Sequence, residues 1–142
     1  MNKLNLGSGN DYRKGWVNVD IDPDIKTDWC GDATKMPYPD NHFEEIFSHH
    51  SLEHFTCLFT ILNELVRVSK NGATWEHTVP YWSWPMNQGN PHHHIYFSEH
   101  TMKFFDKVNG VYKRGQKQPY SLEEIDTEWD EREITFRLKI NK

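Results

Sequence analysis

Short apolar runs alternate with turn-forming residues through the first third of the chain. The pattern predicts a strand over 4–6 that stops at a Gly-Ser-Gly-Asn turn, and a second strand over 16–20. A third, very short strand is expected within 28–33, and a fourth over 43–48, where a cluster of serine and histidine follows. This part of the chain is therefore expected to be rich in strands.

Helix and strand alternate in the remainder. Apolar residues at three- and four-residue spacing predict a helix over 56–70, with the Asn-Gly pair at 71–72 as its stop. A strand is predicted over 73–79. Ser98 is expected to cap a second helix that ends at 109–110. Alternating residues over 134–140 predict one half-buried strand near the C-terminal end.

This order of elements predicts an α/β fold with a Rossmann-like, mostly parallel sheet and flanking helices, formed by residues 1–142 as a single domain. In such sheets, ligands bind beyond the carboxyl ends of the strands. The polar residues that follow the predicted strands are at 7–10, 20, 32–33 and 48–54. We expect them to converge on one edge of the sheet.

Glycines 7 and 9 allow the backbone to pass close to a ligand, and the carboxylate of Asp20 is suited to accept the hydroxyls of a ribose. A dinucleotide fingerprint requires a third glycine, which this chain lacks, and an acidic strand-end residue about 20 positions further on, whereas only eleven positions separate Gly9 from Asp20. The link between Gly9 and Asp20 is too short for a helix that would hold a pyrophosphate. A ligand with a ribose and no phosphate fits better, which favours S-adenosylmethionine.

Several motifs in order resemble the class I S-adenosylmethionine-dependent methyltransferases, in a small, truncated form close to the type 11 methyltransferase domains. The segment 36–46 resembles that branch's LPFPDNSFDEI sequence, and 63–72 resembles its NEIxRVLKPGG helix end. The other matching segments are Leu4–Gly9, Val17–Asp20, Gly31–Ala33 and Leu52–His54. The resemblance covers roughly residues 3–105, and it implies S-adenosylmethionine as the cofactor.

The resemblance also implies roles for individual residues. The backbone of Gly7, Ser8 and Gly9 is expected beneath the methionine and ribose, and Asp20 at the ribose hydroxyls. Asp32 would accept from the adenine amino group while the amide of Ala33 donates to the ring. The remaining expected contacts are Ile21, Ser48 and His49, the last two at the methionine end, and Asn5.

Three features depart from the family's pattern. Asn5 stands where an acidic residue is usual, which implies a weaker or indirect contact with the cofactor's amino group. The first helix is nearly deleted. After Gly110 the chain is expected to be too short for the usual last two strands, so that only one strand forms. An unfinished sheet leaves an uncovered edge, which favours a homodimer.

Nine histidines in this length call for an explanation. His49, His50 and His94 are candidate general bases, because the pKa of histidine lies near neutrality. The simpler alternative is that these side chains bond to backbone and water. The run from His50 to His54 also fits the H-x-x-E-H pattern of zinc hydrolases, but it follows a strand directly and lacks the long helix of that motif. We therefore expect no metal ion.

Composition narrows the class of partner. The net charge of −5 disfavours nucleic acid, and no apolar run is long enough to predict a membrane span. The basic run 113–117 is expected to be a solvated loop. Two cysteines do not make a disulfide framework, which favours a cytoplasmic protein. We expect methyl transfer to a small-molecule or glycan-like acceptor. The alternatives are a catalytically inactive module that binds S-adenosylmethionine and, less favoured, a zinc-dependent hydrolase.

Overall fold

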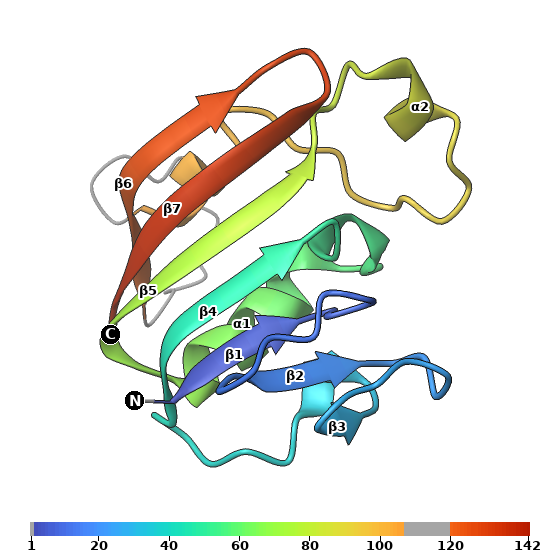
Figure 1. The fold of residues 1–142 in the computed structure, drawn as a ribbon. Coiled ribbons are helices and arrows are strands. Elements are labelled where there is room, and N and C mark those ends of the chain that lie inside the picture. The colour runs from blue at the N-terminus through green and yellow to red at the C-terminus, as the bar shows by residue number, and fades with distance from the viewer. Residues whose placement is uncertain (1, 107–119) are drawn as a thin grey trace.

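The structure, a computed structural model, describes residues 2–106 and 120–142. One seven-stranded sheet forms its centre, with the strand order β3-β2-β1-β4-β5-β7-β6 (Figure 1). The strands are β1 (Lys3–Leu6), β2 (Val17–Asp20), β3 (Trp29–Cys30), β4 (Phe43–His49), β5 (Ser69–Pro80), β6 (Ser121–Trp129) and β7 (Glu133–Asn141). Strands β1 to β5 are parallel, and β7 runs antiparallel to both neighbours. The predicted Rossmann-like α/β fold is confirmed.

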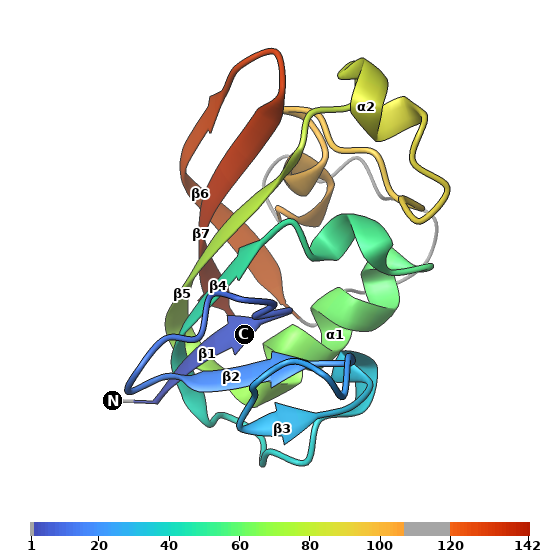
Figure 2. The same cartoon turned by 45° about the vertical axis from the view of Figure 1, so that its right-hand side comes forward.

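Helix α1 (Leu58–Val68) lies against one face of the sheet, as Figure 2 shows. Its apolar stripe is buried as the residue spacing predicts, and it joins the hydrophobic core with Leu4 of β1 and Ile46 of β4. The buried apolar residues of the helix are Ile61, Leu62, Leu65, Val66 and Val68. This packing holds the strands β1 and β4 in place beneath the site.

The predicted stop of this helix is wrong. The helix ends at Val68, and β5 begins at once with Ser69, whose hydroxyl donates to the carbonyl of Leu65 at 2.7 Å. Gly72 has a φ of +80° inside β5, where the register with β4 shifts. The Asn-Gly pair therefore forms a bulge in a strand, a second structure that requires the same left-handed backbone.

Two of the sequence motifs, the 36–46 segment and the end of helix α1, are joined by hydrogen bonds. Glu64 on α1 accepts a bond from the amide of Met36 at 2.7 Å. Arg67, one turn further on, donates to the carbonyls of Met36 and Tyr38 and to the carboxylate of Asp40. These contacts attach the 36–40 segment to the helix. They also fix the position of the short 3-10 helix η1 (Ala33–Lys35) that precedes it.

The link between β1 and β2 contains turns and no helix, so the predicted deletion of the first helix is confirmed. Side chains of this link cover part of the sheet instead. The guanidinium of Arg13 lies 3.4 Å from the ring centre of Phe47 on β4. Trp16 meets the same ring edge-on, with 6.4 Å between ring centres. Two large flat side chains of this loop thus pack against β4.

The C-terminal prediction is wrong, because two strands, β6 and β7, form a hairpin and complete the sheet. Residues 121–129 are rich in acidic residues, so their sequence does not carry the apolar alternation of a strand. Arg137 on β7 balances the negative charge of these acidic side chains. It donates to Glu76 on β5 at 2.9 Å and to Asp126 and Glu128 on β6 at 3.0 and 2.8 Å.

The completed sheet removes the original reason to expect a homodimer. Its outer strand β6 exposes charged side chains, which disfavour pairing with another strand. The homodimer stays a prediction that light scattering tests.

The second predicted helix is also wrong within the described residues. The region holds a 3-10 helix, η3 (Met102–Phe105), whose N-cap position is occupied by Thr101 rather than by Ser98 and has no side-chain cap hydrogen bond. Its predicted end at 109–110, and the basic run 113–117, lie outside the described residues. The other helices of the described part are η2 (Leu52–His54) and α2 (Pro85–Gln88), each about one turn long. No helix of the described part has the length and apolar character needed to cross a membrane.

Candidate functional site

The residues that follow β1, β2, β3 and β4 converge on one edge of the sheet, as the sequence predicts. Two adjoining cavities open there. The first has a volume of about 440 Å³, and the second about 360 Å³. Both are lined by Gly7, Asp20 and Ser51, so the two hollows meet over the ends of β1 and β2. A ligand with two parts joined in the middle fits this shape.

Gly7 forms the floor where the two cavities meet. Its φ is +61°, which L side chains rarely adopt, and a Cβ there would lie 2.3 Å from the hydroxyl oxygen of Ser51. Only glycine fits this position. The side chain of Ser51 therefore packs directly against the backbone of Gly7 at the junction of the two cavities.

Asp20 ends β2 with its carboxylate at the junction. Oδ2 accepts a bond from the amide of Gly9 at 2.8 Å, and Oδ1 accepts from the amide of Asp22 at 3.0 Å. These two bonds fix the carboxylate plane, and each oxygen keeps a second lone pair. The arrangement suits a pair of neighbouring hydroxyls.

Asp32, Ala33 and Ile21 all line the first cavity. The Asp32 side chain caps η1, where Oδ1 accepts from the amide and the hydroxyl of Thr34 at 2.9 and 2.7 Å. These bonds lower the pKa of Asp32, so the carboxylate is charged at neutral pH. Ala33 is the first residue of η1, directly after this cap.

Asn5, Ser8 and Gly9 line the second cavity. Asn5 is held by Asn18 and by the carbonyl of Asp11, at 3.0 and 2.7 Å. The hydroxyl of Ser8 is buried and has no hydrogen-bond partner among the described residues. A buried polar atom without a partner is costly, and a ligand with a polar group would satisfy it.

Ser48 does not join the other predicted residues. It is fully buried, and its hydroxyl lies 2.7 Å from Nδ1 of His77 on β5, away from both cavities. Its neighbours Phe47 and His49 line the second cavity instead, because successive side chains of a strand point to opposite faces. Burial lowers the pKa of His77 to about 3, so this pair is neutral.

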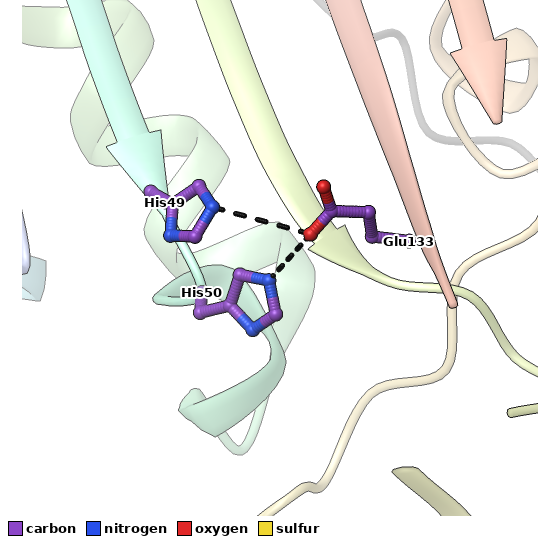
Figure 3. A group of neighbouring side chains, drawn as sticks. All are labelled: His49, His50 and Glu133. Carbon is purple, nitrogen blue, oxygen red and sulfur yellow. Dashed lines mark hydrogen bonds and ion pairs between the residues drawn. The ribbon is translucent and has the colours of Figure 1, made fainter. Parts of the chain in front are cut away.

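His49 and His50 stand at the end of β4 and face Glu133, the first residue of β7 (Figure 3). His50 Nε2 lies 3.0 Å and His49 Nε2 4.0 Å from Oε2 of Glu133. His50 has a φ of +51°, one of two non-glycine residues with positive φ in the described ranges. Burial, followed by the nearby His50, lowers the pKa of His49, which favours its neutral form.

His94 is exposed and lies apart from both cavities. Its amide and that of Ile95 donate to the carbonyl of Glu53, at 2.7 and 3.2 Å, so the backbone of this segment is attached to η2. Glu53 itself is fully buried, and burial raises its pKa to about 7. The H-x-x-E-H run thus lies on a 3-10 turn and lacks the long helix of a zinc hydrolase.

Several residues that line the cavities were not singled out by the sequence. Cys57 and Thr60 line the first cavity, and Phe47 lines the second. The acidic partner of His49 and His50 comes from Glu133, far along the chain. A strand prediction beginning at Glu133, with β5 and β7 paired, would have been needed to find it.

Comparison with known proteins agrees with this geometry. Residues 9–75 match a family model described as a methyltransferase domain. Over 44 residues the chain is 46% identical to ajmaline N-methyltransferase from Rauvolfia serpentina, a stretch that is 31% of this chain and only 15% of that protein.

Two solved structures share the fold over nearly the whole chain. A SAM-dependent methyltransferase from Archaeoglobus fulgidus has a TM-score of 0.69 at 14% identity, with 98% of this chain and 86% of that one covered. A SAM-dependent methyltransferase from Aquifex aeolicus has a TM-score of 0.67 at 15% identity, with 98% and 81% covered.

The sheet belongs to the same fold as the S-adenosylmethionine-dependent methyltransferase structures, and residues 9–75 match the methyltransferase domain model. These similarities support a class I S-adenosylmethionine-dependent methyltransferase, with S-adenosylmethionine as the cofactor. The residues present fit that cofactor. Gly7, which leaves no room for a side chain, the fixed carboxylate of Asp20 and the hydroxyl of Ser8, buried without a partner among the described residues, are compatible with its ribose and its amino acid part.

Proposed function

We propose that this protein transfers the methyl group of S-adenosylmethionine to an oxygen, nitrogen or carbon nucleophile of a small-molecule or glycan-like acceptor. The observation that carries the proposal is the pair of cavities that meet at Gly7 and Asp20. Their sizes and polar groups suit a nucleoside on one side and an amino acid on the other.

Each cavity has residues for one part of the cofactor. In the first, Asp20 would accept the ribose hydroxyls, Asp32 the adenine amino group, and the Ala33 amide would donate to the ring. In the second, Asn5 and the Ser8 hydroxyl are the polar groups for the amino acid part. Ser48 has no part in this proposal, because it faces the core.

His49 and His50 are the candidate bases. The bound cofactor supplies a sulfonium-activated methyl group, so the protein's main task is to hold the acceptor in line with it. His49 lines the second cavity, and its lowered pKa leaves it free to take a proton near neutral pH. Glu133 orients the two rings and would stabilise the charge that the base acquires.

The glycan-like class of acceptor is supported by a third hollow of about 450 Å³ after β5. Trp82 and Tyr96 line it and are about half exposed, at 48% and 47%. Glu99 and His100 add polar groups. Flat aromatic faces beside hydrogen-bonding groups suit a ring that carries hydroxyls.

A reducing compartment, as in the cytoplasm, is part of the proposal. Cys30 and Cys57 are both free and exposed. Such thiols persist where glutathione and thioredoxin keep them reduced.

Calorimetric titration with S-adenosylmethionine and with S-adenosylhomocysteine tests the core of the proposal. We expect one site per chain for each ligand. A folded protein that gives no heat with either ligand would end the proposal. Incubation with a panel of sugars, amines and phenols then tests for S-adenosylhomocysteine formation. Binding without product across that panel would instead indicate a module that binds the cofactor without turnover.

A further inference from the structure

Glu53 is the least satisfied ionisable side chain of the described residues. It is fully buried, and neither carboxylate oxygen has a hydrogen-bond partner there. The nearest basic atoms, His54 Nε2 and His50 Nδ1, lie 3.7 and 3.8 Å from its Oε1, which is beyond hydrogen-bonding distance. A buried carboxyl group without hydrogen-bond donors either keeps its proton or is compensated by a cation. Glu53 is therefore a candidate ligand for a cation if further ligand atoms lie beside it.

Two histidines complete a set of ligands around this carboxylate. One ligand atom each from Glu53, His54 and His93 lies within 4.8 Å of the others. A tetrahedral ion with bonds of about 2.0–2.2 Å would bring its ligand atoms to roughly 3.3–3.6 Å apart. The separation of 3.7 Å between Glu53 Oε1 and His54 Nε2 is close to that value. Small side-chain movements would close the set.

Hydrogen bonds at Nδ1 leave Nε2 of both histidines available to a metal ion. Nδ1 of His54 lies 3.1 Å from the carbonyl of His92, and Nδ1 of His93 lies 2.7 Å from Oδ1 of Asn87. Because both acceptors are oxygens, Nδ1 carries the proton and Nε2 keeps its lone pair. Asn87 is fully buried, and its amide donates to the carbonyl of Tyr81 at 3.0 Å, which fixes its orientation. Oxygen acceptors behind the ring are typical of metal-binding histidines.

We propose that Glu53, His54 and His93 bind one divalent transition-metal ion of the zinc class. Two imidazoles and one carboxylate are a ligand set that zinc accepts with a fourth position open. Asn90, whose amide lies 3.0 Å from Nε2 of His93, must turn away when the ion binds. The ion would attach the 87–93 segment to η2.

This site differs from the zinc-hydrolase motif, and it departs from the expectation of no metal. In that motif both histidines of H-x-x-E-H bind the metal and the glutamate acts as base. Here the glutamate is a ligand and His50 is directed to Glu133 instead. The second histidine ligand comes from the segment after β5. No hydrolase activity follows from this arrangement.

Metal content of the untagged full-length protein tests the proposal. The protein is stripped with a chelator, dialysed against Zn²⁺, freed of loose metal and analysed for zinc and protein. We expect one zinc per chain. His54→Ala and His93→Ala should each weaken binding by about 100-fold or more, and Asn87→Ala by about 10- to 100-fold. His49→Ala is the matched control and should bind as the native protein does.

Three results would overturn the proposal. One is a native protein that retains no zinc and shows no change in Tm with zinc. Another is full binding by His54→Ala and His93→Ala. The third is loss of binding in His49→Ala alone, which would assign the ion to His49, His50 and Glu133. If a variant fails to fold by circular dichroism, the native protein loaded with Co²⁺ decides, since a tetrahedral site gives intense visible absorption and its absence contradicts the site. None of these readouts depends on methyl transfer.

Discussion

His50 Nε2 lies 3.0 Å from Oε2 of Glu133, and this contact joins the end of β4 to the start of β7 across 83 positions of the chain. His49 reaches the same oxygen at 4.0 Å (Figure 3). One carboxylate therefore faces both histidines at the mouth of the second cavity. The antiparallel C-terminal hairpin supplies it, so the last strand contributes to the site as well as to the sheet.

Removal of this carboxylate should change the titration of His49. Burial is the main cause that lowers the pKa of His49. The nearby His50 and Arg13 lower this pKa further, whereas Glu133 and Asp11 raise it. Glu133→Gln removes a charge that favours the protonated ring, so the pKa should fall further. Titration of the His49 ring protons by NMR checks this. Glu131→Gln, a change at an exposed neighbour, is the control, and an unmoved or higher midpoint in Glu133→Gln would contradict the prediction.

Asp20→Ala should weaken the binding of S-adenosylhomocysteine by about 10- to 100-fold. Hydrogen bonds to a charged group contribute about 1.5–3 kcal/mol, and the change also releases the amide of Gly9. Calorimetry measures the effect. Asp24→Ala, in the exposed turn that follows, serves as the control and should leave affinity unchanged. Equal affinity in the two variants would place the ribose elsewhere.

Gly7→Ala should destabilise the protein more than Gly9→Ala. Both glycines have positive φ, which costs a side chain about 1–2 kcal/mol, but only at Gly7 would the new Cβ collide with Ser51. Overpacking of this kind adds about 1–3 kcal/mol. Urea denaturation gives both free energies of unfolding. The double change Gly7→Ala with Ser51→Gly should restore only the share of the free energy of unfolding that is lost to the steric clash with Ser51. Equal losses in Gly7→Ala and Gly9→Ala would refute the close contact.

His77 should make the protein sensitive to acid. Its pKa is about 3 in the folded protein because it is buried, against an ordinary value of 6.5. Between these values the unfolded chain binds a proton that the folded protein does not. Stability should therefore fall as pH drops below 6.5, by about 1.4 kcal/mol per pH unit from this residue, with no effect above.

His77→Gln removes this titration and should flatten the dependence of the unfolding free energy on pH between 6.5 and 3. Urea denaturation at several pH values measures the slope. His100→Gln, whose side chain is 69% exposed, is the control and should keep the native slope. A native slope in His77→Gln would show that other groups cause the acid sensitivity.

Local signals were enough to predict much of the first half of the fold and several of the residues that line the two cavities. Gly7 must be glycine for its own backbone, Asp20 ends a strand whose apolar residues are adjacent to it, and α1 shows its buried face in residue spacing. Each of these features depends on neighbours within a few positions, and the parallel order places strand ends at one edge. The convergence of residues 7–10, 20 and 32–33 follows from that.

Only the tertiary structure decided the rest, because it depends on partners far along the chain. The acidic strand β6 is stable beside Arg137, a residue on the next strand, so its own composition does not predict it. Ser48 faces His77 and the core because the alternation of side chains along β4 fixes which face of the sheet it occupies. The polar cluster in the sequence does not show which face that is. The approach of Glu133 to His50, and of His93 to Glu53, is set by long-range pairing and packing, whose energies no local pattern records.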